Sequence, residues 1–87
     1  MREAKYIVVD NMKGCEGIVV FPNFEDHFKI ASLYGGKDHV VSAGTCNIYF
    51  NIIDEELVFE CHGKSTTLEI NARKDEDSKL LKRMFSD

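Results

Sequence analysis

Residues 39–53, HVVSAGTCNIYFNII, decide the fold because they form the longest run of strand-forming residues in the chain. β-Branched and aromatic side chains favour the extended backbone of a sheet. An isolated glycine inside such a run is typical of a bulge or a break. The run therefore predicts a long strand that is interrupted at Ser42, Ala43 and Gly44.

The second half of this strand is apolar on both faces. Alternation directs Ile48, Phe50 and Ile52 to one face, and Tyr49 and Ile53 to the other. A strand that is buried on one face alone alternates apolar and polar residues more cleanly. We therefore expect either that helices cover both faces or that one face meets another chain, as in a homodimer or a complex.

Upstream of this strand, the sequence predicts a hairpin followed by a helix. Residues 5–10 and 18–21 are strand-like runs on either side of a turn-rich loop, NMKGCEG. Asn23 then suits the N-cap of a helix of about three turns that ends at the glycines 35–36. The apolar face of this helix would consist of Phe24, His27, Phe28, Ile30, Ala31 and Tyr34.

Downstream, the acids at 54–56 predict a polar turn, and residues 57–61 and 66–70 predict two more strands. Residues 76–85 predict a short helix, because acids precede bases in the order that a helix dipole favours. Its apolar face would consist of Leu80, Leu81, Met84 and Phe85.

The order β-β-α-β-β-β-α predicts one α+β domain over residues 1–87. Short connections favour an antiparallel sheet of about five strands. We expect the two helices to cover one face of this sheet, which would give a two-layer sandwich.

Composition narrows the classes of function. The chain has 11 basic and 15 acidic side chains, and no cationic stripe that would bind nucleic acid directly. Its three cysteines show no CxxC spacing, and neither a signal peptide nor a membrane span is evident. We therefore expect free thiols and a cytoplasmic protein with no cofactor.

CHGKSTT, at residues 61–67, resembles the end of a phosphate-binding P-loop. The first glycine of that motif would stand at position 58, which is Val58, and a strand-like rather than a helical pattern follows Ser65. We therefore expect no nucleotide binding here, and Gly63 reads as a turn residue with positive φ.

Cys61 and His62 raise two further possibilities, a metal site and catalysis. Adjacent residues of a strand point to opposite faces, so these two would not easily share one metal ion. Nothing in the sequence activates a cysteine, and we expect Cys46 and Cys61 to act as small buried apolar residues. The sequence thus favours a protein that holds no metal and is not an enzyme.

Four segments resemble those of a group of small proteins encoded in tailed phages and prophages. They are VVSAG at 40–44, CHGKS at 61–65, Asp77-Ser78, and LLKRM at 80–84. The chain departs from the group at ARKDEDS, where the group has Ser-Arg-Pro-Glu-Asp. No chemical activity is assigned to that group, so the resemblance implies no site residues in this chain. It implies a small accessory protein in the host cytoplasm, of the kind that disables host enzymes or defence complexes, as anti-CRISPR proteins do.

The leading hypothesis is therefore a phage-encoded protein-interaction module that inhibits a host nucleic-acid-handling or defence protein. Its predicted contacts are the acids Asp54, Glu55 and Glu56 together with Tyr49. The alternative is a protein that binds or sequesters a small ligand, in a pocket between sheet and helix or across a dimer. A third hypothesis is a small enzyme that uses Cys61 or His62.

Overall fold

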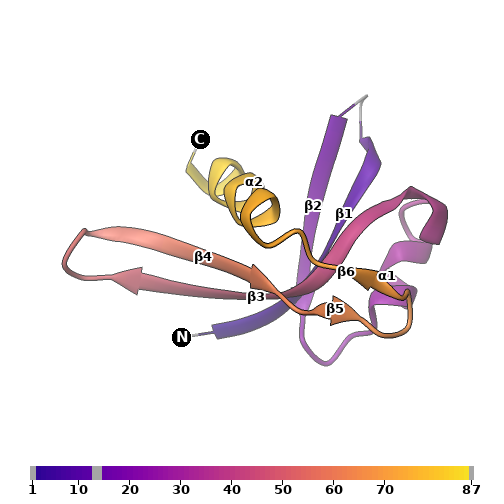
Figure 1. Ribbon diagram of the computed structural model, residues 1–87, viewed down its shortest axis with the longest axis horizontal. Helices are drawn as coiled ribbons and strands as arrows, with labels where there is room; N and C mark the ends of the chain where they lie inside the picture. Colours follow the sequence, from indigo (N-terminus) through magenta and orange to yellow (C-terminus); the bar gives the residue numbers. More distant parts are fainter. Residues whose placement is uncertain (1, 13–14, 87) are drawn as a thin grey trace.

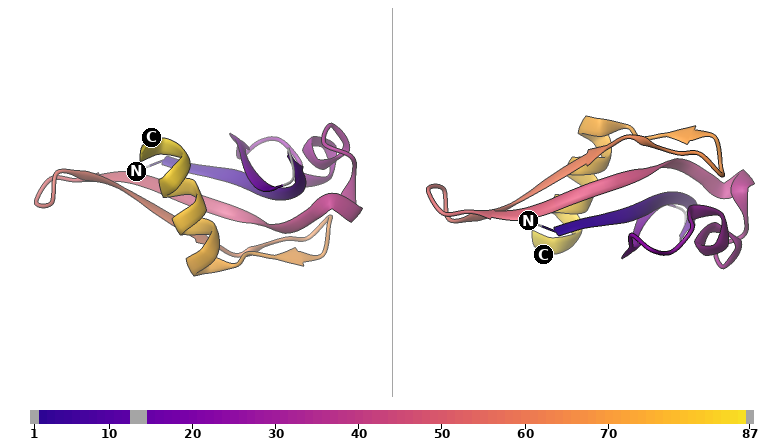
Figure 2. Two further views of the ribbon diagram at one scale, coloured as in Figure 1. Left: turned by 90° about the horizontal axis from the view of Figure 1, so that it is seen from above. Right: turned by 90° about the horizontal axis from the view of Figure 1, so that it is seen from below.

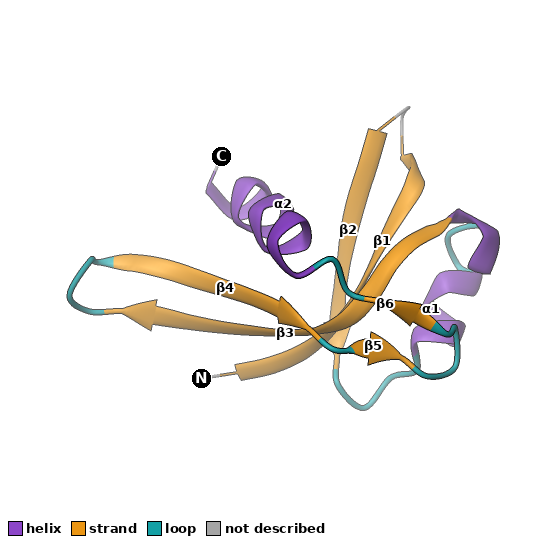
Figure 3. Ribbon diagram, viewed as in Figure 1, coloured by secondary structure: helices purple, strands orange, loops and turns teal. Residues whose placement is uncertain are grey.

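The computed structural model describes residues 2–12 and 15–86 and is of the α+β class (Figures 1 and 3). The predicted antiparallel sheet with two helices is confirmed. The elements in chain order are β1 (Arg2–Met12), β2 (Cys15–Pro22), α1 (His27–Ser32), a 3-10 turn (Lys37–His39), β3 (Val40–Asn51), β4 (Glu56–His62), β5 (Lys64–Ser65), β6 (Ile70–Asn71) and α2 (Lys74–Ser86).

The main sheet has four antiparallel strands in the order β2-β1-β3-β4. β3 runs unbroken through Gly44, which pairs with Tyr6 of β1, so the predicted break of the strand there is wrong. An irregularity does lie just before it, because the pairing with β1 shifts register between Ser42 and Val40. A Cβ atom at position 44 would collide with the carbonyl oxygen of His62. Glycine is therefore needed at this position because two backbones approach closely, and not because the strand ends.

The predicted strand at residues 66–70 is also wrong. β5 and β6 are two-residue strands that pair with each other, and residues 66–69 form the turn between them. The Ser65 hydroxyl accepts the Leu68 amide at 3.2 Å, and Glu69 adopts a φ of 57°. This local hydrogen bond offers the backbone an alternative to a sheet ladder. The turn buries Leu68 completely.

The first helix is shorter than predicted, and its N-cap is Asp26 rather than Asn23. A turn precedes it, in which the Glu25 amide donates to the Pro22 carbonyl at 3.1 Å, and this turn leaves Phe24 largely exposed. His27 is the buried anchor of α1, because its Nε2 lies 2.8 Å from the Gly44 carbonyl oxygen. The acceptor character of that oxygen requires the proton on Nε2.

The two helices pack on opposite faces of the sheet, which corrects the expectation that they share one. α2 covers the face that carries Tyr6 and Val8, whereas α1 and the β5–β6 turn cover the face that carries Ile7 and Val9. Figure 2 shows α2 crossing the strands on its side of the sheet. All four of these β1 side chains are fully buried. A central strand that is apolar at consecutive positions needs cover on both faces.

The β3–β4 hairpin extends beyond the rest of the molecule along its longest axis (Figure 1). Pairing between β1 and β3 reaches Ile48, the partner of Arg2. Beyond that point β3 pairs with β4 alone, from Tyr49 and Val58 to the closing turn at residues 52–55. We call residues 49–58 the arm.

Candidate functional site

The arm exposes a group of large apolar side chains. The exposed fractions are 55% for Phe50, 46% for Leu57, 80% for Ile52 and 92% for Ile53. Phe50 pairs with Leu57, so both lie on the face that α2 covers nearer the centre of the sheet. α2 covers this face only as far as Phe59. The ring of Phe59 stacks on the ring of Phe85 in α2, with 5.5 Å between the ring centroids. Phe50 and Leu57 therefore continue the apolar face beyond the helix.

The tip of the arm is a turn held by hydrogen bonds from one side chain. The Asn51 carbonyl Oδ1 accepts the amides of Ile53 at 3.0 Å and Asp54 at 3.3 Å, and its Nδ2 donates to the Asp54 carboxylate at 3.1 Å. Glu55 completes the turn with a φ of 52°. This side-chain scaffold is typical of an Asx turn. It holds Ile52 and Ile53 outward beside two acids.

The structure brings three of the four predicted contact residues together. Asp54 and Glu55 are exposed in the turn, and Glu56 opens β4 and forms a loose ion pair with Lys82, 3.7 Å away. Tyr49 lies apart from Phe50, on the other face of the arm, because neighbours in a strand point to opposite sides. The Glu60 carboxylate beside it raises the pKa of the Tyr49 phenol.

The sequence prediction did not single out Ile52, Ile53 and Leu57 as contacts. Ile52 and Ile53 were assigned to opposite faces of a continuing strand, but β3 ends at Asn51 and both side chains project from the turn. The available signal was the pair of isoleucines directly before an acidic turn. Buried strands place such pairs in the core, so only the position of the turn reveals their exposure.

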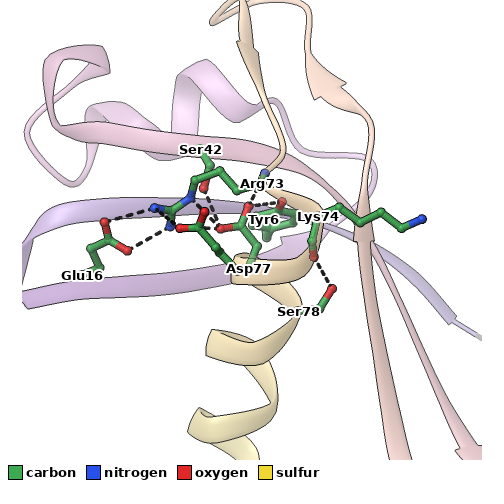
Figure 4. A network of polar contacts seen from close by, with 8 residues as sticks. Tyr6, Glu16, Ser42, Arg73, Lys74, Asp77 and Ser78 are labelled. Atoms are coloured by element: carbon green, nitrogen blue, oxygen red, sulfur yellow. Dashed lines mark hydrogen bonds and ion pairs between the residues drawn. The ribbon is translucent and has the colours of Figure 1, made fainter.

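A second candidate region surrounds Asp77 in the first turns of α2 (Figure 4). Its carboxylate is fully buried and accepts the Tyr6 hydroxyl at 2.5 Å and the Ser42 hydroxyl at 2.9 Å. It also accepts the Arg73 backbone amide at 2.9 Å and the Arg73 Nε at 3.1 Å. Arg73 reaches Glu16 of β2 as well, at 2.9 Å. We call these five residues the Asp77 network.

The Asp77 network has the features of a structural anchor. It joins α2 to β1, β2 and β3, and each group that the carboxylate meets is a donor that satisfies it. Buried charges are tolerated when they are paired and hydrogen-bonded in this way. The network therefore fixes the position of α2 on the sheet and leaves no acceptor directed at a substrate.

The cysteines next to this network are poor nucleophiles. Burial raises the pKa of the Cys46 thiol to about 11, and burial is also the main cause that raises the pKa of Cys61. Cys61 is buried while His62 is exposed, so the two side chains lie on opposite faces of β4. A thiol without a neighbouring base stays protonated and unreactive. The arrangement gives no support to catalysis by Cys61.

The segments that carry the phage-protein resemblance converge on this anchor. Ser42 and Asp77 belong to the network, and Ser78 accepts the Cys61 amide at 2.9 Å while donating to the Lys74 carbonyl at 2.6 Å. Gly44, from the same segment as Ser42, permits the close approach of His62. These segments therefore specify how the fold closes, and they point to no ligand.

The surface has several hollows, two of which have apolar walls. A groove of about 170 Å³ separates β4 from α2 and is lined in part by Leu57, Phe59 and Lys79. A hollow of about 460 Å³ lies at the end of the sheet, where Val20, Phe24 and Ile48 contribute to its walls. Small-molecule sites usually measure about 300–1,000 Å³, so the second hollow has a suitable size and the groove does not. Hollows of about 400 Å³ beside Lys64 and Glu69, and of about 330 Å³ beside Arg73 and Arg83, also fall in this range but have more polar or charged linings.

Within residues 2–12 and 15–86, no cluster of three or more His, Cys, Asp or Glu side chains is arranged to hold a metal ion. No helix in the same ranges is long and apolar enough to cross a membrane.

Comparison with known proteins identifies no relative. The sequence matches no protein family, and neither characterised proteins nor solved structures give a significant match. The functional argument therefore depends on the geometry of the chain itself.

Proposed function

We propose that this protein is a protein-binding module that contacts its partner through the tip of the arm. The observation that carries the proposal is the exposure of Ile52 and Ile53, 80% and 92%, on a hydrogen-bonded turn. Burying an isoleucine side chain completely contributes about 1.5–3 kcal/mol. The fold leaves this free energy unused, whereas a partner with an apolar pocket would gain it.

The chemistry around the isoleucines indicates the kind of partner. Asp54 and Glu55 flank them in the turn, and Glu56 follows. An apolar centre with a charged rim is the usual anatomy of a protein interface. A partner that fits this tip has an apolar pocket bordered by lysine or arginine.

A host protein that handles nucleic acid meets this description, because such proteins carry basic grooves. The resemblance to phage accessory proteins favours the same class, with the chain acting in the host cytoplasm. We propose inhibition as the outcome, since an acidic arm that occupies a basic groove would exclude nucleic acid from it.

The test replaces the tip isoleucines without changing charge. Immobilised wild-type protein and the double variant Ile52→Ser, Ile53→Ser are exposed to bacterial lysate, and bound proteins are quantified by mass spectrometry. Leu33→Ser is the matched control, because Leu33 is 74% exposed and caps α1, which lies at the end of the molecule away from the arm (Figure 1). The proposal predicts a partner that binds the wild type and Leu33→Ser equally, and the double variant at least tenfold more weakly in titrations with the purified partner. Equal retention of every captured protein by all three would refute it.

The hollow of about 460 Å³ favours a second candidate, the binding of a small apolar ligand. Val20 and Ile48 supply apolar walls, and Phe24 lies at the rim. A screen of small apolar compounds by NMR should then shift signals of these three residues. Shifts confined to the arm would count against this candidate.

A further inference from the structure

β4 is an open edge of the main sheet. Its pairing with β3 is regular from Glu56 to His62, and no strand follows it in the order β2-β1-β3-β4. Residues of an antiparallel edge strand alternately direct their N–H and C=O groups toward and away from the neighbouring strand. The Cys61 amide points away from β3, because it donates to Ser78 of α2. By alternation, Leu57 and Phe59 point outward too, and within the described ranges their backbone groups have no partner on that side.

The other edge of the sheet is protected, which makes the openness of β4 distinctive. β2 pairs with β1 through an irregular register between Val9 and Met12, and it ends at Pro22. Bulges and prolines are among the devices by which proteins block edge-to-edge pairing. β4 contains neither.

A groove that could receive the side chains of a further strand already exists beside β4. The groove of about 170 Å³ between β4 and α2 runs past Leu57 and Phe59 on the α2 side. Its volume is below the range of small-molecule sites but accommodates one or two aliphatic side chains. A strand added to β4 would direct every second side chain into this groove.

The opposite face of β4 is acidic. Glu56, Val58 and Glu60 alternate with the groove-facing residues, and both glutamates are exposed. The Glu56 side chain also reaches around the edge of β4 to Lys82 of α2, 3.7 Å away, so a basic side chain of an added strand would compete with Lys82 for it. Opposite charges on neighbouring strands stabilise the pair, and like charges destabilise it. The side chains of an added strand on this face should therefore be basic.

A second copy of the chain does not fit this edge. If two copies of β4 paired antiparallel about Val58, Glu56 of each copy would lie opposite Glu60 of the other, and the like charges would repel. If they paired about Leu57, Glu60 would lie opposite Asp54, with the same repulsion. A register centred on Phe59 avoids these repulsions but requires the outward amide of Cys61, which Ser78 already occupies. The edge therefore favours a different chain.

We infer that the edge of β4 binds an extended segment of a partner protein in which basic and apolar side chains alternate. The basic side chains lie over Glu56 and Glu60, the apolar ones enter the groove, and the backbone pairs with Leu57 and Phe59. This mode is strand addition to a sheet edge. The inference rests on the proposed function only in that the ligand is a protein, since the surface is separate from the tip isoleucines.

The experiment uses the full chain and an acetylated, amidated peptide with the sequence Lys-Val-Lys-Val-Lys-Val. Strand addition predicts saturable binding, with amide hydrogen exchange at Leu57 and Phe59 slowed at least tenfold. The same peptide N-methylated at each valine cannot donate to β4 and should not bind. The variant Glu56→Gln, Glu60→Gln should bind at least fivefold more weakly, whereas Glu69→Gln, which changes an exposed acid elsewhere, should bind normally.

Three outcomes would overturn the inference. They are no binding at millimolar peptide, equal binding of the N-methylated peptide, and binding that leaves exchange at Leu57 and Phe59 unchanged. The variant Ile52→Ser, Ile53→Ser separates this inference from the proposed function, since it should bind the peptide normally while losing the arm-dependent partner. Failure at the edge and failure at the tip are therefore distinguishable.

Discussion

In the Asp77 network, a buried carboxylate is surrounded by donors from three other residues, whereas Ile52 and Ile53 at the tip of the arm remain exposed to solvent. Both regions contain groups that are costly in the wrong environment. The fold satisfies the first group internally and leaves the second exposed. Under the proposed function, stability and binding therefore depend on different parts of this small protein.

The separation makes the two regions independent targets for mutation. Effects of distant sites that share no partner usually add. Changes in the Asp77 network should reduce stability, and changes in the arm should alter binding while leaving the fold intact.

The largest effect is expected from Asp77→Ala. The change leaves the Tyr6 and Ser42 hydroxyls and the Arg73 guanidinium without their shared acceptor. Removing one partner of a buried ion pair typically costs about 3–5 kcal/mol. Urea unfolding monitored by circular dichroism measures the loss.

Asp75→Ala is the matched control for this prediction. Asp75 is exposed in the same first turn of α2, so its loss should cost about 0.3–1 kcal/mol through the helix dipole alone. Equal costs for the two variants would mean that the network does not anchor the helix.

Leu81→Ala should follow, with a loss of about 2–4 kcal/mol, because Leu81 is fully buried in the cluster beneath α2. Met84→Ala on the same helix provides the comparison, since Met84 is about half exposed and should cost less than about 1 kcal/mol. The same urea titrations measure both losses of stability. A loss below about 1 kcal/mol for Leu81 would show that α2 packs only peripherally.

A smaller loss is expected at alkaline pH. Burial raises the pKa of Cys46 from 9.0 to about 11, and burial and then Asp77 raise the pKa of Tyr6. The folded state holds these protons longer than the unfolded chain, so the stabilisation is complete below pH 9 and decreases as the pH rises toward 11. Urea midpoints at intervals across this range measure the slope. Cys46→Ala should flatten it and Cys15→Ala should not; a slope that both variants retain would contradict the assignment.

The smallest effect on stability is expected from Asp54→Asn, Glu55→Gln, Glu56→Gln, within about 0.5 kcal/mol, because all three side chains are exposed. Association with the partner should be slower and less dependent on salt, while dissociation changes little, since charges at a rim mainly guide the encounter. Stopped-flow measurements at several ionic strengths test this. Unchanged association would exclude the tip acids as a steering site.

The sequence predicted the sheet well because its signals are local. The β-branched runs and the amphipathic pattern around Leu81 mark β1 to β4 and α2. It failed where a single local hydrogen bond decides the backbone. The Ser65 hydroxyl turned a strand-like TTLEI into a loop, and the Glu25 amide delayed the start of α1.

The candidate site was predicted only in part, for a related reason. The acids at 54–56 mark a turn by composition alone, so their location at the tip could be predicted. The exposure of Ile52 depends on where β1 stops pairing with β3, which is a property of the assembled sheet. The Asp77 network was not predictable, because its members are brought together only by the complete topology.

The contact between Tyr6 and Asp77 spans 71 residues. During translation the amino-terminal strands emerge first, and folding generally proceeds from that end. The hydroxyl of Tyr6 must therefore wait for its acceptor until residue 77 has left the ribosomal tunnel. Until then α2 does not cover the apolar face around Val8 and Cys46. This face is therefore the surface that a chaperone would bind on the nascent chain.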